Sequence, residues 1–253
     1  MRTVVKALRI LAELSTSTSA LSAATLAQRL DLPRPTVYRY LDTLAEEGLV
    51  ALLDRKAMVT PKLAAIMTPP RQHLTLMKVV QPVLNELVDV SQETASAHIR
   101  AGSIRRCVAE VEGTRGVRWA RGVGFTAPVW SGAVGHVLMG TLSEAEMDTI
   151  LANSKIEALA SMSITDRSEL KRLALLARSE GWSGSVNETV EDACAIAAPV
   201  LTPEGDLLIA ISLYAPSSRY DELPTHVRAL RDAAGRVEKE WARVGGDWAE
   251  AYD

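Results

Sequence analysis

Apolar positions between residues 4 and 44 recur three and four places apart, which is the pattern of amphipathic helices. The pattern predicts a first helix over residues 4–14 and, after a Ser/Thr loop, a second helix with Ser22 at its N-cap. A short turn at residues 31–33 leads into a third helix. One face of this third helix is apolar and is expected to be buried: Val37, Leu41 and Leu44. Two helices joined by so short a turn are the helix-turn-helix pattern.

The other faces of the third helix carry side chains suited to contacts with the phosphates and base edges of DNA. Pro35 suits a first helical turn, and Gly48 is placed to end the helix in a left-handed cap. Arg39 is the first candidate for a base or phosphate contact, whereas Tyr40 is expected to be half-buried. The candidate DNA contacts on this helix are Arg34, Thr36, Tyr38, Arg39 and Thr43. The alternative for each of them is an ordinary solvated helix face.

Residues 49–60 predict a two-stranded hairpin with a basic tip, a wing that follows the third helix. Arg55 and Lys56 at the tip are expected to lie against backbone phosphates, where they add affinity and salt dependence but little sequence choice. The tip lacks the Asn-Gly or Asp-Gly that marks tight turns. A short helix over residues 61–67 is predicted to end at Thr68-Pro69-Pro70.

Helix and strand patterns are mixed in the rest of the chain. A helix over residues 74–91 contains Pro82, which is expected to kink it or split it in two. Residues 95–100 and 105–112 predict a hairpin, and residues 117–120 a further strand. The remaining predicted elements are helices over residues 131–140, 143–153, 166–180 and 223–244, with strands over 195–201 and 207–214.

This order of elements predicts an α+β protein built from a winged helix-turn-helix domain (residues 1–67), a linker with the start of a helix (68–78) and a second domain (79–253). The charge follows the same division. Residues 1–78 contain 11 Lys and Arg against 6 Asp and Glu, whereas the rest contains 17 against 25, although the whole chain has a net charge of only −3. A basic head on an acidic body suits a DNA-binding module carried by a domain with another task.

The composition fits a folded protein of a reducing compartment. Hydrophobic residues make up 47% of the chain and charged residues 23%, while aromatic residues are only 4%. Cys107 and Cys194 are too few for a disulfide framework. No apolar run approaches membrane-spanning length, and the N-terminus reads as an amphipathic helix rather than a signal peptide. We therefore expect a cytoplasmic protein that contacts no membrane.

Motifs for catalysis are missing from the sequence. It contains no Walker motif and no Gly-x-Ser-x-Gly elbow, and its histidines form no close-spaced metal motif. His98 with either cysteine is a weak zinc hypothesis, so we expect no metal, no cofactor and no catalytic residue. Ser131-Gly132-Ala133 at a predicted helix start could offer backbone N–H groups to an anion, or could simply allow close helix packing.

The ordered set of motifs resembles the IclR-type bacterial transcription regulators over nearly the whole chain. The N-terminal half contributes Val4–Leu11, the helix pair up to Arg39, and Gly48-Leu49-Val50. The later half contributes Gly124 with Pro128–Gly135, Gly181-Trp182, Ile196–Val200 and Ile211–Arg219, in the family's order and spacing. The resemblance implies a GAF-like α/β effector domain joined by a helical linker to the winged helix-turn-helix. It also implies homodimers, often dimers of dimers, on partly palindromic double-stranded operators.

Departures from the family's pocket bear on the small molecule that this chain would bind. Trp130, Gly132 and Tyr214 stand where the family often has small polar groups or a histidine, and Cys194 lies one residue before the family's usual cysteine. These changes favour an effector that is bulkier and less polar than a two- or three-carbon keto acid, such as an aromatic or alicyclic acid. The candidate effector contacts are Trp119, Trp130, Ser131, Gly132, Ala133, Ser185, Asn187, Cys194, Ser212 and Tyr214. For the two tryptophans the alternative is ordinary core packing, and the whole pocket could be vestigial.

The leading hypothesis is a ligand-responsive transcription regulator, most simply a repressor, whose operator affinity changes when a small molecule binds. The first alternative is a small-molecule-binding domain or enzyme with a silent DNA-binding head. The second is an adaptor that uses the winged helix for protein contacts. Steep weakening of promoter binding with salt would argue against the adaptor.

Overall fold

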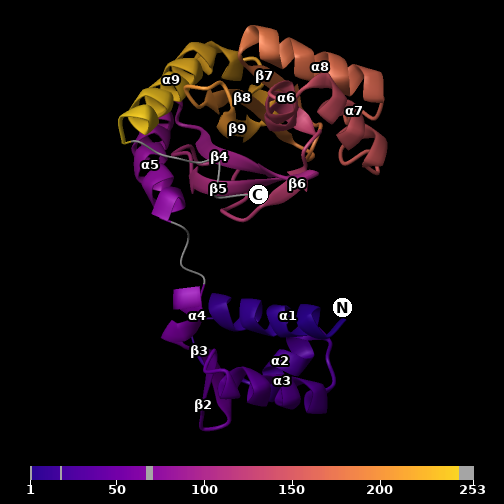
Figure 1. Ribbon diagram of the computed structural model, residues 1–253, viewed down its shortest axis with the longest axis vertical. Helices are drawn as coiled ribbons and strands as arrows, with labels where there is room; N and C mark the ends of the chain where they lie inside the picture. Colours follow the sequence, from indigo (N-terminus) through magenta and orange to yellow (C-terminus); the bar gives the residue numbers. More distant parts are fainter. Residues whose placement is uncertain (1, 18, 67–70, 245–253) are drawn as a thin grey trace. The chain divides into compact units, whose positions relative to one another are not determined.

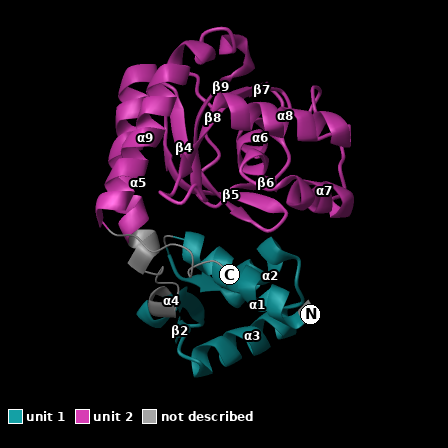
Figure 2. Ribbon diagram, turned by 45° about the horizontal axis from the view of Figure 1, so that its top comes forward, with its two compact units in different colours: residues 1–69 teal, residues 70–253 magenta. Residues whose placement is uncertain are grey.

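We describe a computed structural model of the chain, in which residues 2–17, 19–66 and 71–244 are described. The chain forms two compact units, residues 1–69 and residues 70–253, which are described separately (Figure 2). The predicted helix break at Thr68-Pro69-Pro70 and the tail after Val244 lie outside the described residues. None of the helices in the described part of the chain is long and apolar enough to cross a membrane.

The first unit is a winged helix-turn-helix. Its elements are α1 (Arg2–Thr16), β1 (Leu21–Ser22), α2 (Ala23–Leu30), α3 (Arg34–Glu46), β2 (Val50–Leu53), β3 (Lys56–Val59) and α4 (Pro61–Ile66). The three short strands form an antiparallel sheet in the order β1-β3-β2. The predicted apolar face of α3 is buried in the core of this unit, because Val37, Leu41 and Leu44 are at most 7% exposed.

Local capping sets the ends of α2 and α3. The Ser22 hydroxyl accepts a hydrogen bond from the Thr25 N–H at 3.1 Å, which confirms the predicted N-cap. Gly48 has a φ of +70°, and the N–H groups of Gly48 and Leu49 bond back to the carbonyls of Ala45 and Leu44. This is the Schellman arrangement, which favours glycine at the left-handed position, and it confirms the predicted end of the third helix.

The wing forms as predicted, although its tip contains no glycine. Strands β2 and β3 are joined by Asp54 and Arg55, both of which have positive φ values, 48° and 60°. Two successive residues with positive φ make the type of turn whose twist matches that of the flanking strands. The fold therefore holds an arginine in a backbone conformation that L-residues rarely adopt.

The second unit is a six-stranded antiparallel sheet covered by helices on both faces (Figure 1). The strand order is β6-β5-β4-β9-β8-β7. The strands are β4 (Thr94–Ala101), β5 (Ile104–Val111), β6 (Thr126–Pro128), β7 (Ser183–Val186), β8 (Ala193–Leu201) and β9 (Leu207–Pro216). The helices are α5 (Arg71–Ser91), α6 (Gly132–Gly140), α7 (Glu144–Asn153), α8 (Arg167–Glu180) and α9 (Val227–Val244), with short 3-10 turns at Ser217–Arg219 and Leu223–His226.

Alternating side chains divide the second unit into two cores. On β9, Ile209 and Ile211 pack with residues of α5 and α9, whereas Ala210 packs with residues of α6, α7 and α8. The sheet therefore buries both of its faces, which explains why its central strands are almost continuously apolar. Small residues dominate α6, whose nine residues are all buried.

The structure corrects parts of the sequence prediction. Residues 117–120 are not a strand but lie in the loop between β5 and β6. The short edge strands β6 and β7 were missed, because three or four residues rich in Gly, Ser and Pro carry little strand signal. Pro82 does not split the helix, since α5 continues through it.

Candidate functional site

The polar face of α3 is open to solvent in the first unit. Arg34, Arg39 and Thr43 are exposed, Tyr38 is 52% exposed, and Thr36 is half-buried. Tyr40 is more buried than expected, at 8%, and the Arg39 guanidinium carbon lies 5.8 Å from the centroid of its ring. The Thr43 hydroxyl donates to the Arg39 carbonyl at 3.0 Å. The helix thus leaves two guanidinium groups, those of Arg34 and Arg39, and the hydroxyl-bearing side chains of Tyr38 and Thr43 exposed.

The tip of the wing adds two more cations. Arg55 and Lys56 are both exposed. Lys62 is a third basic residue near the wing, and it was not among the candidate DNA contacts. Its Nζ donates to the Glu47 carbonyl at 2.7 Å. It therefore joins α4 to the C-terminal end of α3, where a positive charge is favoured by the helix dipole.

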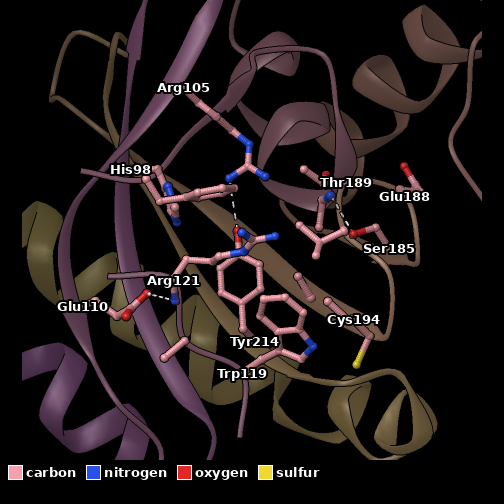
Figure 3. Close-up of a pocket in the computed structure, with 16 residues that line it drawn as sticks. His98, Arg105, Glu110, Trp119, Arg121, Ser185, Glu188, Thr189, Cys194 and Tyr214 are labelled. Carbon is pink, nitrogen blue, oxygen red and sulfur yellow. Dashed lines mark hydrogen bonds between the residues drawn. The ribbon is translucent and has the colours of Figure 1, made fainter. Parts of the chain in front are cut away.

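The second unit contains a cavity between the sheet, the start of α6 and two loops (Figure 3). The space in it is about 540 Å³ when the open solvent at its mouth is counted, and the centres of water-sized molecules can occupy only about 30 Å³ of it. Its wall is made of apolar and aromatic side chains together with a few charged ones. The lining residues are His98, Arg105, Glu110, Trp119, Ala120, Arg121, Phe125, Ala133, Ser185, Glu188, Thr189, Val190, Ala193, Cys194, Ala195 and Tyr214.

Half of the residues expected at an effector site line this cavity. They are Trp119, Ala133, Ser185, Cys194 and Tyr214. The other expected residues do not appear in the lining: Trp130, Ser131, Gly132, Asn187 and Ser212.

Three of those five are engaged elsewhere in the fold, Trp130 by core packing and the two serines by hydrogen bonds. Trp130 is 3% exposed and packs in the core under α6 and α8. Ser131 shares a hydrogen bond with the Thr189 hydroxyl at 2.8 Å, and Ser212 shares one with Ser96 at 2.9 Å. Gly132 and Asn187 both adopt positive φ, at 69° and 50°, in the backbone around the start of α6 and the end of β7.

A β-bulge puts unexpected charged residues into the cavity. On β5 the register against β4 shifts, so that Ala97 pairs with Ala109 but the next residue, His98, pairs with Cys107. Arg105 pairs with Arg100 and Glu110 pairs with Ser96, and because 96 and 100 lie on one face of β4, both side chains face the cavity. A strict alternation along the sequence would have put Arg105 and Glu110 on opposite faces.

Arg105 is a buried cation at this site. It is 2% exposed, and its Nη1 donates to the Tyr214 hydroxyl at 3.1 Å (Figure 3). Its guanidinium carbon lies 5.9 Å from the centroid of Phe125, and its Nε is buried without a hydrogen-bond partner. No carboxylate pairs with it among the ion pairs of the described residues. Burying a cation without an anion is unfavourable, so this arrangement costs stability unless another group completes it.

His98 lies beside Arg105 and is equally buried, at 1% exposure. Its Nε2 lies 2.9 Å from the Ser96 hydroxyl, which is 2.9 Å from the Ser212 hydroxyl. Burial, and then the positive charge of Arg105, lower the pKa of His98 well below its ordinary value. The imidazole is therefore neutral, and its Nδ1 is buried without a partner.

The mouth of the cavity is formed by the loop between β5 and β6. The exposed Arg121 stacks between Trp119 and Phe125, with its guanidinium carbon 4.9 Å from each ring centroid. Trp119 Nε1 donates to the Asp192 carbonyl at 2.7 Å, which ties this loop to the β7–β8 loop. The Glu110 carboxylate accepts the Gly122 N–H at 2.8 Å. These contacts cover the cavity with aromatic rings and leave the Arg121 charge at the surface.

The start of α6 is already occupied by side chains of the chain itself. The Ala133 N–H donates to the Ser185 hydroxyl at 2.9 Å. A Cβ on Gly132 would lie 2.5 Å from Thr189 Oγ1, so there is no free space in front of this helix turn. Of the backbone N–H groups that the sequence offered for an anion, that of Ala133 is used by Ser185 and that of Ser131 by the Pro128 carbonyl.

The two thiols are protonated and buried. Burial raises the pKa of Cys194 to about 11 and that of Cys107 to about 12. The Cys194 thiol donates to the carbonyls of Ala215 and Pro216 at 3.4 and 3.3 Å. Neither is suited to act as a nucleophile or metal ligand in this state. Within the described residues no group of three or more His, Cys, Asp or Glu could hold a metal ion.

Both units match families of known regulators. Residues 3–53 match the IclR helix-turn-helix domain, and residues 71–239 match the family described as bacterial transcriptional regulator IclR C-terminal. The HTH-type transcriptional regulator KipR of Bacillus subtilis is 25% identical over 245 residues, which cover 94% of this chain and 96% of KipR.

Solved structures agree on the fold. A transcriptional regulator from Rhodococcus sp. RHA1 is 27% identical with a TM-score of 0.77, covering 96% of this chain and 99% of its own. An IclR homolog from Microbacterium hydrocarbonoxydans, solved in complex with 4-hydroxybenzoate, is 20% identical with a TM-score of 0.77, covering 95% and 99%. These findings make the chain a DNA-binding regulator with an effector-binding C-terminal domain, not an enzyme. The chain belongs to the IclR family of bacterial transcriptional regulators.

Proposed function

We propose that the chain is a repressor that binds its operator through α3 and the wing and releases it when an organic acid with an apolar body binds in the second unit. The observation that carries the choice of effector is Arg105, a buried guanidinium without a carboxylate partner among the described residues, inside a cavity with aromatic and apolar walls. Such a cavity suits a ligand with an anionic group on an apolar frame.

The DNA-binding part of the proposal is supported by exposure and charge. Arg34 and Arg39 are exposed on α3, and Arg55 and Lys56 are exposed at the tip of the wing. Side chains on the second helix of a helix-turn-helix read base edges, whereas cations on a wing contact phosphates. The excess of basic residues in residues 1–78 over an acidic remainder supports the same division of labour.

The effector class is supported by the shape and lining of the cavity. Phe125, Trp119 and Val190 provide apolar surface against which a ring can pack. The Microbacterium hydrocarbonoxydans homolog, with the same fold, was solved with a ring acid, 4-hydroxybenzoate. We propose the same broad class for this chain, an aromatic or alicyclic acid.

The partner in assembly is proposed to be a second copy of the chain. Three apolar side chains of α1 are exposed in the single chain: Val4 at 63%, Val5 at 53% and Leu8 at 59%. Burying such a stripe against its symmetry mate gives a two-fold dimer, which suits a palindromic operator. Effector binding can then change DNA affinity only by as much as the effector prefers one arrangement of the dimer over the other.

The proposal is tested with the full chain and the DNA upstream of its own gene. Footprinting should reveal a protected, partly palindromic site, and ring acids such as benzoate, 4-hydroxybenzoate and cyclohexanecarboxylate should reduce protection. The same acids should raise the thermal unfolding midpoint by mass action. Stabilisation by glyoxylate or pyruvate alone, with no response to ring acids, would refute the effector class. Absence of any protected site would refute the operator assignment.

A further inference from the structure

We infer that Arg105 and His98 bind the anionic group of the effector on the sheet side of the cavity, and that the N-terminus of α6 does not. The inference rests on the proposed function, which takes the effector to be an organic acid. Beyond that function, it names the residues that bind the carboxylate, the side of the cavity where the carboxylate lies, and the acids that bind weakly.

Arg105 lacks the anion that would compensate its charge. Only one of its N–H groups is satisfied by a described hydrogen bond, the one to Tyr214, and its Nε has no partner. A carboxylate can accept from a guanidinium at two positions at once, which is the geometry that makes arginine the preferred group for binding planar anions. A ligand carboxylate would therefore provide both the missing negative charge and the hydrogen-bond acceptors for the unpaired N–H groups of Arg105.

His98 is placed to complete the same anion site. It lies on β4, and Arg105 lies on the neighbouring strand β5, as diagonal neighbours on one face of the sheet. If Ser212 donates to Ser96 and Ser96 donates to His98 Nε2, the imidazole proton resides on Nδ1. Nδ1 then becomes a donor, and it is the buried atom that has no partner. A bound carboxylate selects this tautomer.

The other end of the cavity repels an anion. The Ser185 hydroxyl accepts the hydrogen bond of the Ala133 N–H, and the Thr189 side chain fills the space beside Gly132. Glu188 also lines this end, and its carboxylate lies 3.3 Å from His136 Nε2. Figure 3 shows His98 and Arg105 on one side of the cavity and Ser185, Glu188 and Thr189 on another. Glu110 lies on the same face of β5 as Arg105, but its carboxylate accepts the backbone N–H groups of Arg121 and Gly122 at 3.4 and 2.8 Å. The charges left to meet a ligand are therefore Arg105 on one side of the cavity and Glu188 on the other.

This polarity restricts the ligand to acids with a single carboxylate. The carboxylate faces Arg105 and the neutral end of the ring faces Glu188, next to the Ser185 and Thr189 hydroxyls. A hydroxyl on the far side of the ring can donate there. A second carboxylate in that position meets the Glu188 charge at short range, which is unfavourable in a cavity of low dielectric.

The experiment uses the full chain and calorimetric titration with three probes. They are 4-hydroxybenzoate, its uncharged counterpart 4-hydroxybenzamide, and terephthalate, which has a carboxylate at both ends of the ring. The wild-type chain should bind 4-hydroxybenzoate at least about tenfold more tightly than either of the others, which is the usual effect of a charge-assisted hydrogen bond. Equal binding of the acid and the amide would overturn the inference.

Matched variants locate the anion. Arg105→Met keeps an apolar stem without the charge and should weaken 4-hydroxybenzoate binding by about 10- to 100-fold. Arg105→Lys should recover part of this loss. Arg121→Met removes an arginine of the same cavity that stands at the mouth, and it should change the affinity by less than about threefold. Ser185→Ala should leave the affinity for benzoate, which has no hydroxyl to place at that end, within about threefold. A loss of about tenfold or more in this variant would place the acid at α6 instead.

His98→Phe provides a second route if Arg105→Met fails to fold. It removes one neutral donor and should weaken 4-hydroxybenzoate by about 2- to 10-fold without affecting 4-hydroxybenzamide. Unliganded Arg105→Met should unfold at the same temperature as the wild type or higher, since an uncompensated charge has been removed.

The outcomes separate this inference from the proposed function. Binding of 4-hydroxybenzoate to the wild type and to Arg105→Met with equal affinity would overturn the assignment of Arg105 and leave the organic acid in place. If neither 4-hydroxybenzoate nor the other ring acids bound the wild-type chain, the proposed effector class would fall, and the inference with it.

Discussion

At the scale of single residues, exposure and burial give similar side chains different tasks. Arg39 and Arg105 are both arginines without ion pairs in the described residues, yet one is exposed on a helix and the other is 2% exposed in a cavity. An exposed guanidinium is free to contact DNA at little desolvation cost. A buried guanidinium without a partner costs folding free energy, because its charge has lost its hydration. Binding an anion offsets that cost, so the buried group favours anionic ligands. The same chemistry thus serves two different partners.

Replacement of Arg39 by alanine should weaken operator binding by roughly 1–3 kcal/mol if the guanidinium makes a bidentate base contact. The measurement is a gel shift at fixed salt with the DNA upstream of the gene. Arg228→Ala is the matched control, because that side chain is 95% exposed on α9 in the other unit. An unchanged affinity for the Arg39 variant would remove this residue from the DNA interface.

The depressed pKa of His98 makes stability depend on pH. In the folded chain His98 stays neutral, whereas in the unfolded chain it takes up a proton near its ordinary pKa of about 6.5. Below that pH the unfolded state binds more protons, so the free energy of unfolding falls as the pH falls towards the folded pKa.

We therefore expect His98→Phe to lose less stability than the wild type when the pH is lowered from about 7 to about 5. The contribution of this one group to the slope cannot exceed about 1.4 kcal/mol per pH unit. Urea unfolding at a series of pH values measures both slopes. Parallel curves for the two proteins would show that His98 does not contribute to the pH dependence.

At the scale of elements, the wing combines a strained turn with a proposed DNA contact. Arg55 holds a left-handed conformation with φ of 60° while its side chain is exposed. Glycine adopts this conformation without a steric penalty but loses more backbone entropy on folding. Stability and DNA contact therefore respond differently to a change at this position.

Arg55→Gly should leave the free energy of unfolding unchanged or raise it by up to about 1 kcal/mol. The same change should lower the slope of log affinity for DNA against log salt by about 1, because one phosphate contact is lost. Arg55→Lys is the control that keeps the charge and should keep the slope. A salt slope that is equal in all three proteins would mean that the tip of the wing does not contact DNA.

At the scale of the whole molecule, the two units divide the proposed work. The first carries the exposed cations and the apolar stripe on α1, and the second contains the cavity. Each unit has a hydrophobic core of its own. In this proposal the dimer couples them, because a change in one protomer's second unit alters how two DNA-reading helices are presented together.

Leu8→Glu should convert the proposed dimer to monomers at micromolar concentration, since it puts a charge into the apolar stripe. The fold of the single chain should persist, because Leu8 is 59% exposed in it. Sedimentation velocity measures the change, with Gln28→Glu, at an exposed position on α2, as the charge control. A dimer that survives Leu8→Glu would place the seam elsewhere.

Local patterns in the sequence determined most of the elements. The three helices of the DNA-binding unit, the caps at Ser22 and Gly48, and the long helices of the second unit follow from periodicity and from residues acting within one turn of the chain. The polar face of α3 could also be identified, because its position depends only on the helical period. Interactions of this kind involve neighbours in sequence, so a single sequence reveals them.

The tertiary structure alone decided which side chains meet in the cavity. The bulge opposite His98 turned Arg105 and Glu110 to the same face, and its presence depends on pairing between two strands rather than on either strand alone. Ser185 reaches the start of α6 from a residue 52 positions away, which makes an expected anion donor unavailable. Long-range pairing decides which polar groups are satisfied and which remain free, and the free ones define the proposed site.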